Sequence, residues 1–139
     1  MGPINIFRFN NYLFFAAMLC LIISCEQSRV FDKNIPLNKN GWNYGEQIQF
    51  EVNVNDTIIP YNLYVNVRHT DEYPYDNLWV KLTTVFPDST SRQNEINVKL
   101  SEPDGKWTGN CVDGICFNSV LVQNNFLLPQ KGKYIFILE

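Results

Sequence analysis

Hydrophobic and polar residues alternate over several short stretches of this chain. Residues 47–54, "QIQFEVNV", place Ile48, Phe50, Val52 and Val54 on one side and polar residues on the other. A period of two is typical of a half-buried β-strand, because successive side chains of a strand point to opposite faces. Similar patterns predict five further strands, at residues 62–69, 78–86, 95–100, 117–123 and 133–139.

The stretches between the predicted strands carry turn residues, as in "NDTIIP", "FPDSTS" and "EPDG", and no helical period follows the first segment of the chain. We therefore expect an all-β fold, an antiparallel immunoglobulin-like β-sandwich over residues 42–139. Tyr134 follows Gly132 by two positions, and such a tyrosine often bonds its hydroxyl back to the backbone in these sandwiches. An ordinary core tyrosine fits the pattern equally well.

The last predicted strand is apolar on both faces, through "YIFIL" at residues 134–138. Such a strand should be central and should have two neighbours. Because the sequence stops at Glu139, we expect that the sandwich lacks its last strand in this chain. Two explanations stay open: the sequence is a fragment, or a partner supplies the missing strand by β-augmentation.

The start of the chain has a different pattern, an unbroken apolar run from Leu13 to Ile23 that follows Arg8. Eleven residues rise only about 16 Å as a helix, roughly half of a bilayer core, which favours a signal peptide over a membrane span. The run ends in Ser24-Cys25, which resembles a bacterial lipobox. The resemblance implies cleavage between Ser24 and Cys25, with diacylglycerol on the Cys25 thiol and an acyl chain such as palmitate on the new amino terminus.

This interpretation divides the chain into a lipoprotein signal peptide (1–24), a mostly polar lipid-anchored tether (25–41) and the folded domain (42–139). Two or more acyl chains would hold the protein stably on a membrane. Glu26 rather than Asp follows Cys25, which by resemblance to the sorting rules of other envelopes favours the outer membrane. We expect the domain to lie on the periplasmic face. The alternative is an ordinary signal peptide that contains an incidental cysteine.

Two further cysteines, Cys111 and Cys116, flank "VDGI". Asp-Gly is a favoured two-residue hairpin turn, which would place the two cysteines directly opposite each other. Val112 and Ile115 would form the hydrogen-bonded pair next to the turn, and the two cysteines would form the following, non-hydrogen-bonded pair. Cα atoms in a non-hydrogen-bonded pair are about 4.5 Å apart, within the range of a disulfide. Since an exported protein meets an oxidising compartment, we predict a Cys111–Cys116 disulfide.

The sequence offers little for catalysis or metal binding. The net charge is −3 without a Lys/Arg cluster, which argues against a nucleic-acid partner. The one histidine, His69, lies on the inward face of its predicted strand, and we expect no catalytic residues, no metal and no cofactor apart from the lipid on Cys25. A hydrolase would require His69 to share a pocket with the loop carboxylates, among them Asp71, Asp76 and Glu102.

Aromatic residues are the remaining candidates for contact with a partner or a glycan: Tyr73, Tyr75 and Trp79 around Pro74, and Trp107 in "DGKWTG". They could form a sugar-binding platform, or they could pack a turn onto the core. The sequence leaves both interpretations open.

Several short motifs, in order, resemble the GldH gliding-motility lipoproteins of the Bacteroidota. They are the strand that contains Arg68, the run Tyr73-Pro74-Tyr75-Asp76-Asn77-Leu78, Asp104-Gly105-Lys106-Trp107 and Gly132-Lys133-Tyr134. The resemblance implies a non-catalytic envelope lipoprotein of the gliding machinery, linked to type IX secretion and to the movement of surface adhesins, with other gliding and secretion proteins as partners. A carbohydrate-binding outer-membrane lipoprotein is the alternative.

Overall fold

The structure, a computed structural model, describes residues 29–38 and 41–139. The predicted signal peptide, Ser24 and Cys25 lie outside these residues. Residues 29–38, from the predicted tether, are solvent-exposed and belong to no strand. Within the described ranges, no helix has the length and the apolar character that crossing a membrane requires.

Residues 48–138 form seven strands, and all pairing between them is antiparallel. The six strands predicted from alternation are all present, which confirms the all-β prediction; the narrower immunoglobulin-like assignment stays a prediction. The seventh strand, β5, is the first arm of the predicted hairpin. The strands are β1 (Ile48–Val54), β2 (Tyr61–Thr70), β3 (Asn77–Val85), β4 (Ser91–Lys99), β5 (Asn110–Val112), β6 (Ile115–Phe126) and β7 (Gly132–Leu138).

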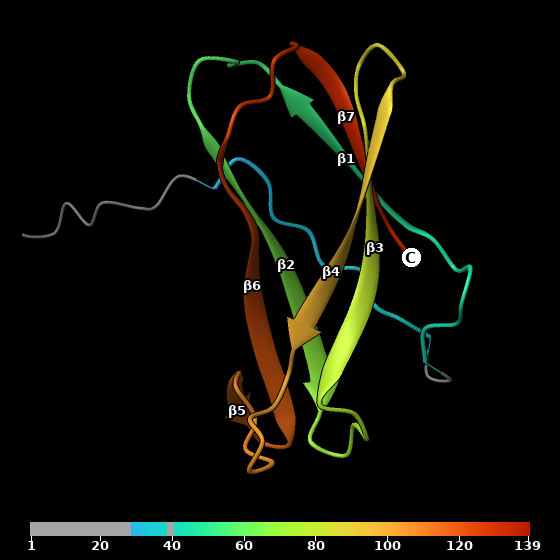
Figure 1. Cartoon of the computed structure of the whole chain (residues 1–139), viewed down its shortest axis with the longest axis vertical. Coiled ribbons are helices and arrows are strands. Elements are labelled where there is room, and N and C mark those ends of the chain that lie inside the picture. The colour runs from blue at the N-terminus through green and yellow to red at the C-terminus, as the bar shows by residue number, and fades with distance from the viewer. Residues whose placement is uncertain (1–28, 39–40) are drawn as a thin grey trace, which may run out of the picture. The chain divides into compact units, whose positions relative to one another are not determined.

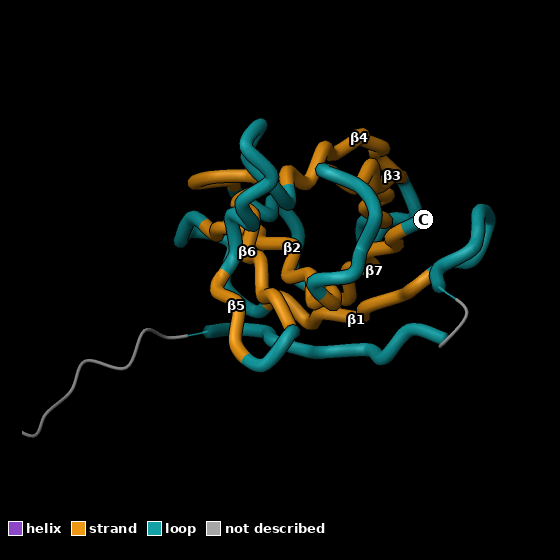
Figure 2. Tube along the Cα trace, turned by 90° about the horizontal axis from the view of Figure 1, so that it is seen from below, coloured by secondary structure: helices purple, strands orange, loops and turns teal. Residues whose placement is uncertain are grey.

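The strands form two sheets. One sheet has the order β1-β7-β3-β4 and the other has the order β2-β6-β5. Figure 1 shows the long strands β2 and β6 side by side, and the end-on view in Figure 2 shows them facing the layer that contains β3 and β7. The chain crosses between the layers after β1, β2, β4 and β6.

Strand β7 is central, as its two apolar faces predict. It pairs with β1 along its length, from Ile48↔Leu138 to Val54↔Gly132, and with β3 from Leu82↔Leu138 to Val85↔Ile135. The prediction of an unfilled place beside β7 is therefore wrong. Both neighbours of β7, β1 and β3, come earlier in the chain, so no strand has to follow β7 to complete its pairing.

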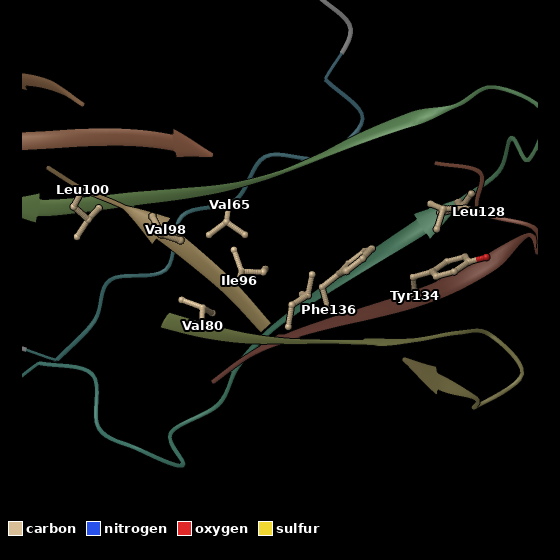
Figure 3. Packing of buried hydrophobic residues seen from close by; sticks show 10 residues of the cluster. Val65, Val80, Ile96, Val98, Leu100, Leu128, Tyr134 and Phe136 are labelled. Atoms are coloured by element: carbon tan, nitrogen blue, oxygen red, sulfur yellow. The ribbon is translucent and has the colours of Figure 1, made fainter. Parts of the chain in front are cut away.

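The core lies between the two sheets. Side chains at alternate positions of β3, β4 and β7 supply most of it, including Val80, Leu82, Ile96 and Val98, and β2 contributes Val65 (Figure 3). Burial of each such aliphatic side chain stabilises the fold by about 1.5–3 kcal/mol before the entropy cost of ordering it.

Tyr134 is fully buried and links the core to the loop before β7. Its hydroxyl donates a hydrogen bond to the carbonyl oxygen of Gln130 at 3.0 Å and accepts one from the Gln130 backbone N–H at 3.1 Å. The ring packs edge-on against Phe86, with centroids 5.6 Å apart. Tyr134 is thus a core residue whose hydroxyl bonds back to the backbone, which combines the two interpretations of the sequence.

Candidate interaction surfaces

Three connections meet at one end of the domain, at the bottom of Figure 1: the β2–β3 loop, the β4–β5 loop and the β5–β6 turn. They meet there because β2 and β4 end where β3 and β6 begin. Aromatic side chains of these loops collect around His69 at the end of β2. The ring centroid of His69 lies 4.6 Å from that of Trp107 and 5.6 Å from that of Tyr73.

His69 is held by hydrogen bonds on both ring nitrogens. Its Nδ1 lies 2.8 Å from the carbonyl oxygen of Thr70, and its Nε2 lies 3.0 Å from the amide Nδ2 of Asn118. The neutral tautomer with a proton on Nδ1 satisfies both contacts, because Nε2 then accepts the amide proton. The buried Asn118 also accepts a hydrogen bond from the Thr108 hydroxyl at 3.0 Å. These bonds give His69 a structural role that joins β2, β6 and the β4–β5 loop.

The predicted aromatic contacts do not form one platform. Tyr73 and Trp107 are partly buried against the core, and burial is the main reason that the pKa of Tyr73 is raised, with a smaller contribution from Tyr75. Tyr75 contacts Tyr73, with centroids 5.6 Å apart, and is itself exposed. Trp79 belongs to another surface. It alternates with the buried Val80 along β3 and therefore points outward from the four-stranded sheet.

An open hollow of about 440 Å³ lies on the same outward side of the sheet as Trp79, although Trp79 is not one of its lining residues. Trp79 is 63% exposed, and its cross-strand partner Asn97 lines the hollow. The Ser101 hydroxyl donates a hydrogen bond to Asp76 at 2.9 Å on one wall of the hollow. His69 is absent from the lining, so the hollow does not join the histidine to these carboxylates. The residues lining it are Asp76, Asn77, Asn97, Lys99, Ser101, Glu102 and Pro103.

The β5–β6 hairpin has the predicted register. Val112 pairs with Ile115, and Cys111 pairs with Cys116. The turn residues Asp113 and Gly114 have φ angles of 51° and 77°, as a turn matching the twist of the strands requires. The two cysteines are joined by a disulfide in the structure, with Cα atoms 4.0 Å apart. Among the described residues, no group of three or more His, Cys, Asp or Glu side chains is placed to hold a metal ion.

A second exposed surface escaped the sequence interpretation. The outward side of the three-stranded sheet carries five large apolar side chains that are 37% to 63% exposed: Tyr64, Val112, Ile115, Phe117 and Leu121. The signal was present in the sequence, since Tyr64 interrupts an otherwise polar outward series in β2. A single exposed tyrosine is common on protein surfaces, so this surface can be recognised only when the cross-strand neighbours of Tyr64 are known.

The fold defines the class of this protein: an all-β domain built from two antiparallel sheets. The family model described as "GldH lipoprotein" matches residues 29–139, and the chain belongs to this family. The resemblance found in the sequence motifs is thereby confirmed.

The chain is similar in sequence to two proteins named as gliding-motility lipoproteins. The chain is 24% identical over 126 residues to "Gliding motility lipoprotein GldH homolog" of Christiangramia forsetii, covering 91% of this chain and 76% of that protein. It is 29% identical over 114 residues to "Gliding motility lipoprotein GldH" of Flavobacterium johnsoniae, covering 82% of this chain and 70% of that protein. No solved structure matches the chain.

Proposed function

We propose that this protein is a non-catalytic lipoprotein of the gliding-motility machinery, acting through contacts with other envelope proteins and linked to type IX secretion and adhesin movement. The observation that carries the proposal is the family match over residues 29–139, together with relatives named as gliding-motility lipoproteins. Deletion of the gene in the native host tests it: spreading should stop and should return with the wild-type gene. Unimpaired spreading of the deletion strain would contradict the proposal.

The anchor in this proposal is a lipid on Cys25, at the outer membrane and facing the periplasm. The lipobox at Ser24-Cys25 supports it. The sixteen residues 26–41 would let the domain move at most about 55 Å from the membrane when fully extended. Replacement Cys25→Ser should move the protein from the membrane fraction to the soluble fraction, whereas Cys20→Ser, in the segment discarded with the signal, should leave it in the membrane. Retention of the Cys25→Ser protein in the membrane would contradict the anchor.

A second candidate function is carbohydrate binding, and the exposed Trp79 favours it, because its cross-strand partner Asn97 lines a surface hollow. An indole face packs against the apolar side of a sugar ring, and neighbouring Asn and Lys side chains can bond to its hydroxyls. Binding on a glycan array that Trp79→Ala abolishes and Tyr44→Ala preserves would support this function, since Tyr44 is an exposed aromatic residue that belongs to no strand. Absence of binding to any glycan would remove it.

We also infer that the sandwich is immunoglobulin-like. The two Tyr134 hydroxyl bonds to the Gln130 backbone support the inference, because a buried tyrosine bonded to the backbone upstream is a hallmark of those sandwiches. An experimental structure whose nearest structural relatives are other sandwich types would contradict it.

A further inference from the structure

The outward side of the sheet formed by β2, β6 and β5 is an unusual surface for a domain of this size. Its five exposed apolar residues, Tyr64, Val112, Ile115, Phe117 and Leu121, define a patch that we name the sheet-B face. The pair Tyr64↔Leu121 lies at one end of the face, Phe117, Ile115 and Val112 lie toward the other end, and the polar pair Asn66↔Ser119 lies between them. From Tyr64 to the end of β2 the face is about 20 Å long, at about 3.4 Å per residue. Several large exposed apolar side chains on one side of a sheet are typical of an interaction site.

One charged group lies within the sheet-B face. Arg68 is directly opposite Phe117, and its guanidinium carbon lies 5.5 Å from the centre of the Phe117 ring. Within the part of the chain that the structure describes, Arg68 takes part in no salt bridge. The other strand residues on this side are uncharged, such as Asn66 and Ser119. An arginine placed over an aromatic ring, beside other exposed apolar and polar side chains, matches the composition of a protein interface.

The charged groups on and near this face indicate which kind of partner can bind there: a second copy of the chain, a lipid bilayer or a different protein. A second copy of this chain, docked through the same face about a two-fold axis, would offer Arg68 no carboxylate from the strands of that face, so the charge would stay unpaired. A bilayer is opposed by two carboxylates at the hairpin end. Asp113 occupies the turn itself, and the Asp71 backbone N–H bonds to the Gly114 carbonyl oxygen at 3.0 Å, which keeps the Asp71 carboxylate beside the turn. Insertion of Val112 and Ile115 into lipid would remove both carboxylates from water.

We propose that the sheet-B face is the docking surface for a different protein, one that presents an apolar surface with a carboxylate positioned to bind Arg68. Tyr64, Phe117 and Leu121 supply the buried centre, and the Arg68 guanidinium selects the partner by a charge-assisted hydrogen bond. The Cys111–Cys116 disulfide holds the hairpin arm that carries Val112 and Ile115. The inference rests on the proposed function and names the surface through which that function acts.

Photo-crosslinking in the native host tests the proposal. A photoreactive phenylalanine analogue replaces Leu121 in the otherwise full-length protein, and a matched control places it at Glu95. Glu95 is exposed on the outward side of β4, on the other sheet. The expected result is one heavier adduct with another envelope protein from position 121 and none from position 95. An adduct with a second copy, an adduct with lipid alone, or equal labelling from both positions would overturn the proposal.

Charge variants make the test specific. Arg68→Glu should reduce the adduct from position 121 by roughly tenfold or more, because the partner carboxylate would then meet a like charge. Arg68→Lys should retain most of the adduct, and the melting temperatures of both variants should stay close to that of the wild type, since Arg68 is exposed. Undiminished crosslinking of Arg68→Glu would overturn the role of Arg68. If the deletion strain still spreads normally, the proposed function fails; if spreading stops but position 121 gives no adduct, only the docking surface fails.

Discussion

Replacement of Tyr134 by Phe removes one oxygen atom from the most enclosed aromatic side chain of the core. The hydroxyl joins β7 to the loop before it through two hydrogen bonds with the Gln130 backbone, at 3.0 and 3.1 Å. The ring itself stays in place in the variant, so its packing against Phe86 is preserved. The substitution therefore isolates the contribution of the hydroxyl.

The expected loss follows from the two bonds. Each intramolecular hydrogen bond contributes about 0.5–1.5 kcal/mol net. Gln130 is only partly buried, so water can replace some of the lost bonding to its backbone groups. We expect the free energy of unfolding to fall by about 1.5 kcal/mol, which for a domain of this size lowers the melting temperature by roughly 6–12 °C.

Thermal unfolding followed by circular dichroism on the purified protein measures this shift. Tyr64→Phe is the matched control, because the Tyr64 hydroxyl is exposed and makes no hydrogen bond within the described part of the chain. The control should shift the melting temperature by less than about 2 °C, consistent with ordinary surface substitutions. If Tyr134→Phe shifts it no more than Tyr64→Phe does, the hydroxyl does not tie the loop to the core and the reasoning is refuted.

Three further predictions concern the turns and the hairpin. Gly109→Ala should destabilise the protein by about 1–3 kcal/mol in urea unfolding, because the new Cβ would lie 2.5 Å from a backbone oxygen of β6. Thiol titration should find Cys111 and Cys116 unreactive until reductant is added, and reduction should lower stability by no more than about 2 kcal/mol because the closed loop is short; reactive thiols in protein taken directly from the envelope would contradict the disulfide. The pKa of Asp88 is lowered chiefly by the hydrogen bond from the Thr90 hydroxyl, so its stabilising effect is present at neutral pH and is lost as the pH falls through that lowered value. Asp88→Asn should therefore weaken the decline of stability below about pH 4, and an unchanged acid profile would contradict this assignment.

The strands were predictable because alternation is a local signal. Ile48 to Val54 and Leu63 to Val67 alternate strictly, and both stretches occur as strands with the predicted side inward. The start of β4 was missed because Ser91, Arg92 and Gln93 are polar on both faces, and only pairing with β3 makes them a strand. The hairpin register was predictable because Asp113-Gly114 specifies its own turn.

The order of strands in the sheets was not predictable in the same way. Pairing of β7 with β1 joins residues at opposite ends of the domain, and no local pattern encodes a contact at that separation. The arrangement of the candidate aromatic residues in space also had to come from the structure. Trp79 and Tyr75 are close in sequence, but alternation along β3 directs Trp79 away from the loop aromatics. The sheet-B face exists only once Tyr64 and Leu121 are placed opposite each other.

The most direct test of the central claim is movement of surface adhesins on living cells that lack this protein. Adhesin-coated beads or labelled adhesins are tracked on individual cells of the native host with the gene deleted, and then with the wild-type gene restored. If the protein works in the gliding machinery, directed movement should cease in the deletion strain and return with the restored gene. Directed movement at the wild-type speed in the deletion strain would contradict that role.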